Sequence, residues 1–190
     1  RPEPGASATA VRLAAKGFDP VVLPLTEIVP VPPREPGACD AVVATSANAL
    51  RHAPAGFLAG LAGRRLFAVG EATATAARRA GFADIVTAAG TADDLAALIG
   101  QAMPAGARIL HLAGRERTAG FGEELTRRGF AVEIVETYRA DEAGYEPDFL
   151  ARMLGGAPLW GALAFSERGG HLLAALAERP EIRERFEETR

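Results

Sequence analysis

The stretch that decides the fold is residues 41–48, which read Ala-Val-Val-Ala-Thr-Ser-Ala-Asn. A short apolar run is followed by a turn of small polar residues, and a helix-forming stretch comes next. The same order recurs along the chain, although the copies at 1–5 and 85–94 are partial. The copies lie at 1–5, 66–73, 85–94, 108–118 and 162–170. Short apolar runs without clean alternation are typical of strands covered on both faces. Their alternation with helices predicts parallel βαβ units.

The predicted helices also have recognisable ends. Gly17, Gly81 and Gly129 each stand shortly after a basic residue and directly before a phenylalanine. A cation near the negative end of the helix dipole, followed by glycine, is typical of a helix C-terminus with a left-handed cap. We therefore expect these three glycines to end helices.

Composition excludes several classes of protein. The net charge is −3, from 24 acidic and 21 basic residues, so nucleic acid is not expected as a ligand. The chain has one cysteine, which fits a reducing compartment and a cytoplasmic location. Its histidines, His52, His111 and His171, lack ligand spacing and are expected at surfaces or strand ends, so no metal site is predicted. No apolar run approaches the ~20 residues of a membrane span. The opening Arg1-Pro2 suggests that a strand preceding it is missing.

A longer repeat suggests two similar lobes. Residues 1–28 and 115–138 share an arginine, a helix, a Gly-Phe pair and an apolar stretch, and each copy leads on to a strand with a serine turn. The first lobe is predicted to hold 1–29 and 141–190, truncated at both ends, and the second to hold 39–131. The connections, 30–38 and 132–140, are expected to pair as a two-stranded bridge beside a cleft.

The turns are the predicted site, because ligands of open parallel sheets collect beyond the carboxyl ends of the strands. Free helix N-termini there favour a small anionic ligand. The alternative is that the hydroxyl groups only cap helices. Thr91, followed by Asp94, is assigned to capping, while both interpretations stay open for Ser46 and Thr73. No Walker motif, nucleophile elbow or close carboxylate pair is present.

In order along the chain, several motifs resemble those of the uroporphyrinogen-III synthase family. These motifs are Thr-Ser-Ala-Asn-Ala-Leu at 45–50, Phe-Ala-Val-Gly-Glu-Ala-Thr-Ala at 67–74, Arg-Gly-Phe at 128–130 and Val-Glu-Thr-Tyr-Arg at 135–139. The resemblance implies an α/β fold of two flavodoxin-like parallel-sheet lobes joined by a two-stranded antiparallel β-ladder. It also implies a monomeric, cofactor-free lyase of haem biosynthesis, which dehydrates and cyclises hydroxymethylbilane to uroporphyrinogen III with inversion of ring D. The substrate is a polycarboxylate tetrapyrrole, and its hand-over from hydroxymethylbilane synthase is an interaction to test.

The resemblance assigns roles to individual residues. Tyr138 is the candidate catalytic residue, because a phenol can protonate a departing hydroxyl group. The alternative for Tyr138 is a packed aromatic of the bridge. The candidates for substrate binding are Arg1, Thr45, Ser46, Asn48, Gly70, Thr73, Arg115 and Ser166.

Two other functions remain open from the sequence. One is a non-catalytic module that binds an anionic ligand on a duplicated α/β fold. The other is a nucleotide-dependent transferase with its site between two lobes.

Overall fold

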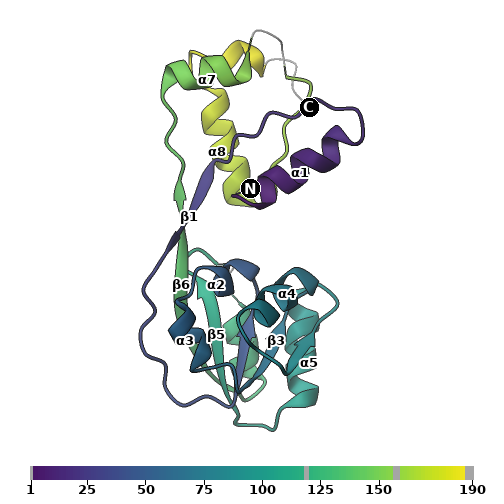
Figure 1. Cartoon of the computed structure of the whole chain (residues 1–190), viewed down its shortest axis with the longest axis vertical. Coiled ribbons are helices and arrows are strands. Elements are labelled where there is room, and N and C mark those ends of the chain that lie inside the picture. Colours follow the sequence, from purple (N-terminus) through teal and green to yellow (C-terminus); the bar gives the residue numbers. More distant parts are fainter. Residues whose placement is uncertain (1, 118–119, 156–158, 187–190) are drawn as a thin grey trace. The chain divides into compact units, whose positions relative to one another are not determined.

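The computed structural model describes residues 2–117, 120–155 and 159–186 and shows a mixed α/β fold with one six-stranded sheet (Figure 1). The chain divides into two compact units. Unit 1 comprises Arg1–Ile28 and Asp141–Arg190, and unit 2 comprises Val29–Ala140. The two boundaries fall within strands β1 (Thr26–Pro30) and β6 (Ala131–Glu142).

Unit 2 holds the parallel part of the sheet. Its strands are β2 (Ala41–Ala44), β3 (Arg65–Ala68), β4 (Ile85–Thr87), β5 (Arg108–Gly114) and β6, and all neighbouring pairs among them are parallel. Residues 41–44 are fully buried. This burial explains why the run is apolar throughout, as the sequence predicted for a strand covered on both faces.

Helices cover both faces of this sheet (Figure 1). One apolar cluster joins Val42 and Ala44 to α2 (Ala47–Arg51), α3 (Ala55–Ala59) and α4 (Glu71–Arg79). The other joins Ala41 and Val43 to α5 (Ala92–Ala102) and α6 (Phe121–Arg127). Successive residues of β2 therefore serve opposite faces, as the pleat of a strand requires.

The strand order is β1-β6-β5-β2-β3-β4. Counted along the chain from β2, the parallel strands stand in the order 3-2-1-4-5. This differs from the flavodoxin-like order 2-1-3-4-5. The flavodoxin-like order results only if the strands are numbered from β5, in the sequence β5, β6, β2, β3, β4. The chain reverses direction across the sheet between β2 and β5, and a doubly wound sheet opens a crevice at such a switch point.

Strand β1 lies at the edge of the sheet and is antiparallel to β6. The Val31 N–H donates to the Thr137 carbonyl at 3.0 Å, and the Ala143 N–H donates to the Leu25 carbonyl at 3.1 Å. Residues 31–39 then run without regular structure. The Glu133 carboxylate on β6 holds this segment, because it accepts hydrogen bonds from the Arg34 guanidinium and from the Gly37 N–H.

Unit 1 differs from the lobe that the sequence predicted. It contains α1 (Gly5–Ala14), α7 (Pro147–Leu154), α8 (Glu167–Ala177) and a short 3-10 helix, Arg183–Arg185. Its small apolar core joins residues of α7 and α8 to Ile182. The strand predicted at 162–165 is wrong, since these residues adopt no regular structure and Leu163 is 58% exposed. The described residues of unit 1 form no parallel sheet of their own. An apolar run becomes a strand only where a neighbouring strand accepts its backbone hydrogen bonds.

The predicted helix ends are confirmed. Gly17, Gly81 and Gly129 have φ of 87°, 93° and 88°. In each case the following phenylalanine donates its N–H to the carbonyl five residues earlier, at 3.1–3.2 Å. This is the Schellman arrangement, which places glycine at the left-handed position.

Candidate functional site

The predicted turns lie at the carboxyl edge of the parallel sheet in unit 2. Thr45 and Ser46 follow β2, Gly70 follows β3, and Gly114 ends β5. Because β2 and β5 are hydrogen-bonded neighbours, the turns at 45–46 and 114–115 flank the switch point. The tertiary structure therefore brings together segments that are about 70 residues apart in sequence.

Ser46 caps α2. Its hydroxyl oxygen accepts the Asn48 N–H at 3.2 Å, and the Asn48 side-chain oxygen accepts a hydrogen bond from Arg51 at 3.4 Å. Both side chains are only partly buried. The Ser46 hydroxyl proton is not used by the cap, so Ser46 retains a donor for a ligand.

The second predicted turn, at Gly70 and Thr73, has no side-chain cap. Gly70 is the N-cap of α4 and supplies no side-chain cap, so the backbone there is open to an approaching group. Thr73 is only 3% exposed, and its N–H donates to the Gly70 carbonyl at 3.0 Å. A ligand would have to displace neighbouring side chains before reaching the Thr73 hydroxyl.

Two other hydroxyl side chains cap helices. The Thr91 hydroxyl accepts the Asp94 N–H at 3.1 Å and donates to the Asp94 carboxylate at 2.7 Å, which confirms the capping prediction for Thr91. In unit 1, Ser166 caps α8 by accepting the Gly169 N–H at 3.1 Å.

Tyr138 on β6 stands opposite Gly114, where the register of the two strands shifts. A Cβ atom at position 114 would lie 2.5 Å from Tyr138 Cζ and 2.8 Å from its hydroxyl oxygen. The ring is partly buried against the core cluster, and the His52 ring lies at 6.3 Å between centroids. Glycine at 114 thus makes room for the Tyr138 ring at the carboxyl end of β5.

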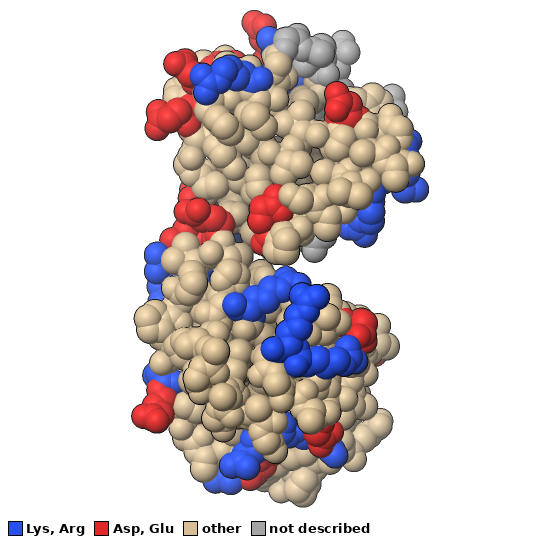
Figure 2. All heavy atoms as spheres, in the orientation of Figure 1, with Lys and Arg blue, Asp and Glu red and all other residues tan. Residues whose placement is uncertain are grey.

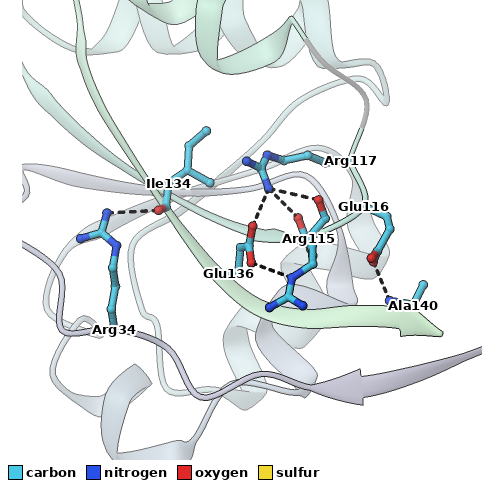
Figure 3. A network of polar contacts seen from close by, with 8 residues as sticks. Arg34, Arg115, Glu116, Arg117, Ile134, Glu136 and Ala140 are labelled. Atoms are coloured by element: carbon cyan, nitrogen blue, oxygen red, sulfur yellow. Dashed lines mark hydrogen bonds and ion pairs between the residues drawn. The ribbon is translucent and has the colours of Figure 1, made fainter.

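The turn after β5 carries a network of charged groups (Figure 3). Arg115 Nε donates to one oxygen of Glu136 at 3.1 Å, and Arg117 Nη1 donates to the other at 3.2 Å. Arg117 also donates to the Gly114 and Arg115 carbonyls at 3.1 and 3.3 Å. The hydrogen bond from Arg115, and then the one from Arg117, lowers the pKa of Glu136.

The same turn contacts β6 at a second point, where the Glu116 carboxylate accepts the Ala140 N–H at 2.7 Å (Figure 3). From the segment 31–39, Arg34 also contacts β6, because it donates to the Ile134 carbonyl at 3.3 Å (Figure 3). The Arg115 side chain is about half exposed, and its hydrogen bond to Glu136 orients it. Arg1, the other predicted carboxylate partner, lies outside the described residues.

The surface charge of unit 2 is uneven. Figure 2 shows several Arg side chains gathered on one part of its surface, with few acidic side chains between them. The net charge of −3 therefore conceals a local basic surface, which favours an anionic ligand.

The sequence did not identify His111 as a residue of the candidate site. It was expected at a surface or strand end, yet it lies within β5 at 3% exposure, and its Nε2 is 3.2 Å from the Thr45 hydroxyl oxygen. Burial, and then the charge of Arg117, lowers its pKa from 6.5 to about 4. The available signal was a lone polar residue inside the apolar run 109–113.

Two other features are absent from the described residues. No group of three or more histidine, cysteine or acidic side chains there could hold a metal ion. Within the same residues, no helix has the length and apolar character needed to cross a membrane.

Comparisons with known proteins bear on this arrangement. The family model described as Uroporphyrinogen-III synthase HemD matches residues 7–188. The crystal structure of uroporphyrinogen-III synthetase from Helicobacter pylori is similar, with a TM-score of 0.66 and 16% identity, over 88% of this chain and 74% of that one. A mutant uroporphyrinogen III synthase from Thermus thermophilus gives a TM-score of 0.50 and 19% identity, over 98% of this chain and 73% of that one. No curated protein matches the sequence significantly.

The two structural similarities concern the fold, because the identities are low. The family match is broader, since it spans both units and includes every predicted site residue except Arg1. It agrees with the resemblance seen in the motifs at 45–50, 67–74, 128–130 and 135–139, and it does not favour a non-catalytic binding module. The chain therefore belongs to the uroporphyrinogen-III synthase family.

Proposed function

We propose that this protein converts hydroxymethylbilane to uroporphyrinogen III as a cofactor-free, cyclising lyase, eliminating water and inverting ring D. The observation that carries this proposal is the family match over residues 7–188. The side chains at the carboxyl edge of unit 2 suit such a reaction, because pyrroles are intrinsically reactive and the protein has mainly to orient them.

Tyr138 is proposed as the catalytic residue. Its phenol would donate a proton to the hydroxyl group of the substrate as the carbon–oxygen bond breaks, so that water leaves and an azafulvene cation remains. Gly114 supports this role, because only a residue without a side chain leaves the ring its present place. The cation then cyclises through a spiro intermediate, as the family resemblance implies.

The carboxylates of the substrate are proposed to bind at the turns. Thr45, Ser46 and Asn48 after β2, and the open backbone at Gly70, offer hydrogen-bond donors, and Arg115 offers a charge-assisted one. Thr73 is proposed to act with the Gly70 turn after local rearrangement, and Ser166 to act from unit 1. Arg1 stays a prediction from the sequence.

The substitution Tyr138→Phe tests the catalytic role. We expect kcat for uroporphyrinogen III formation to fall about tenfold or more, with the melting temperature nearly unchanged because the ring is kept. The assay separates isomer III from the isomer I that forms spontaneously. An unchanged rate would leave Tyr138 as a packing residue only.

Binding at the turns is separated from capping by a matched pair of variants. Ser46→Ala and Thr91→Ala each remove an N-cap and should each cost about 1 kcal/mol of stability. Only Ser46→Ala should raise KM, because Thr91 follows the edge strand β4, away from the switch point. Equal KM values for both variants would show that Ser46 only caps α2 and does not bind the substrate.

The finer expectations are proposals as well. We propose a monomer acting in the cytoplasm that receives its substrate from hydroxymethylbilane synthase, with the boundaries of its two units near residues 29 and 141. Gel filtration would test the monomeric state. The effect of added hydroxymethylbilane synthase on the rate of product formation would test the substrate hand-over. Failure of nucleotides to shift the melting temperature would dismiss the transferase alternative.

A further inference from the structure

His111 occupies an unusual place for a titratable side chain. It lies in β5 opposite Val43 of β2, with Leu110 and Leu112 on either side in sequence. Its ring packs edge-on against Phe121 of α6, with the centroids 5.1 Å apart. An apolar residue would fill this site without the free-energy cost of desolvating an imidazole, so a polar side chain here indicates a function for its ring nitrogens.

One ring nitrogen has a partner and the other has none. Nε2 lies 3.2 Å from the Thr45 hydroxyl oxygen, across the boundary between β5 and β2 where the sheet order switches. Nδ1 is buried and has no hydrogen-bond partner among the described residues. The hydrogen bond to Thr45 is therefore the polar contact that holds His111.

The unpartnered nitrogen decides the tautomer. Burial and the nearby Arg117 keep the imidazole neutral near pH 7, since its pKa is lowered to about 4. A neutral imidazole has one N–H donor and one bare acceptor nitrogen. Buried N–H groups without an acceptor are the rarer arrangement in proteins, so the bare nitrogen belongs at Nδ1 and the proton at Nε2.

We propose that His111 is a positioning residue: its Nε2–H donates to the Thr45 hydroxyl oxygen and so turns the Thr45 hydroxyl proton toward a substrate carboxylate at the switch point. A hydroxyl group that accepts from His111 keeps its own O–H free to donate outward. Thr45 is partly exposed at the carboxyl end of β2, where that donor can meet a ligand. This inference rests on the proposed function and adds to it a residue that touches no substrate.

The enzymatic test uses His111→Phe, Thr45→Val and the double variant. We expect either single substitution to raise KM for hydroxymethylbilane about tenfold with kcat little changed, because one hydrogen bond to a charged group is lost. The double variant should be no worse than either single one, since both remove the same donor. Multiplying effects, or an unchanged KM in His111→Phe, would overturn the proposal.

A conservative variant distinguishes positioning from packing. His111→Gln can place an N–H near the Nε2 position and should restore most of the wild-type KM, whereas His111→Asn, whose amide reaches only as far as Nδ1, should not. Equal KM values for these two variants would contradict the proposal. His111→Phe should melt no lower than wild type, because it removes a buried polar group without opening a cavity.

A spectroscopic test separates this inference from the proposed function. Long-range ¹H–¹⁵N correlation spectra of the full chain should show His111 protonated at Nε2, with a shift of that signal in Thr45→Val. Binding of uroporphyrin III, a stable oxidised form of the product, should weaken about tenfold in His111→Phe. An Nδ1–H tautomer would overturn the inference even in an active enzyme. An inactive wild type that shows the Nε2–H tautomer and the weakened binding would instead overturn the proposed reaction alone.

Discussion

Replacing Gly114 with alanine would put a methyl group into the space that the Tyr138 ring occupies. The new Cβ would lie 2.5, 2.7 and 2.8 Å from Cζ, Cε2 and the hydroxyl oxygen of Tyr138. The φ of Gly114 is not in the left-handed region, so the backbone tolerates alanine and the consequence is confined to the ring.

The size of the effect follows from these distances. Carbon atoms in contact lie about 3.5–4.0 Å apart, so the ring has to move by about 1 Å or more. Overpacking of this kind costs about 1–3 kcal/mol of stability. A displacement of ~1 Å in a group that takes part in the reaction lowers its rate by up to about a hundredfold. We therefore expect kcat of Gly114→Ala to fall roughly tenfold to a hundredfold.

The assay measures the initial rate of uroporphyrinogen III formation at 25 °C, with the folded fraction checked by circular dichroism. Gly63→Ala is the matched control, because a Cβ there meets nothing within 4 Å and it should leave kcat unchanged. In a Tyr138→Ala background the stability cost of Gly114→Ala should vanish, since the ring is gone. A destabilised Gly114→Ala enzyme with wild-type kcat would refute the reasoning that ties catalysis to the position of Tyr138.

Three predictions concern stability. Burial lowers the pKa of His111 from 6.5 to about 4, so between these pH values the unfolded chain binds a proton that the folded chain does not. The free energy of unfolding of the wild type should therefore fall by up to about 3 kcal/mol as the pH drops from 6.5 to 4. Urea titrations at several pH values should show a smaller fall for His111→Phe. Hydrogen bonds from Arg108 hold the pKa of Asp40 well below its usual 3.8, so Asp40→Asn should lower the melting temperature most at neutral pH, with the difference shrinking below about pH 4; a difference independent of pH would contradict this ion pair. Gly81→Ala should cost about 1–2 kcal/mol in chemical denaturation, because its φ of 93° strains any side chain, while Gly63→Ala should cost far less.

Local patterns in the sequence predicted much of unit 2. The apolar runs at 41–44 and 66–68 became buried strands, the glycines before phenylalanine became left-handed caps, and Thr91 became an N-cap. Each of these outcomes depends on neighbours within a few residues, so the sequence contains the whole cause. The run at 162–165 has the same local pattern but forms no strand, because strand formation also depends on a partner elsewhere in the chain.

The candidate site divides in the same way. Tyr138, Ser46 and Arg115 could be named from motifs, but their present partners could not, since Gly114 stands 24 positions before Tyr138 and Glu136 stands 21 after Arg115. The role of His111 could not be predicted for the same reason, because it depends on a contact with Thr45, 66 positions away.

The repeated turn, the parallel βαβ units, the helix ends and the family were determined by the sequence alone, because they depend on short-range backbone chemistry and on ordered motifs. The tertiary structure alone decided the strand order with its switch between β2 and β5, the room that Gly114 leaves for Tyr138, the pairing of Arg115 and Arg117 on Glu136, and the burial of His111 against Thr45. These features arise where strands distant in sequence become neighbours, and only the packed sheet sets which side chains then meet.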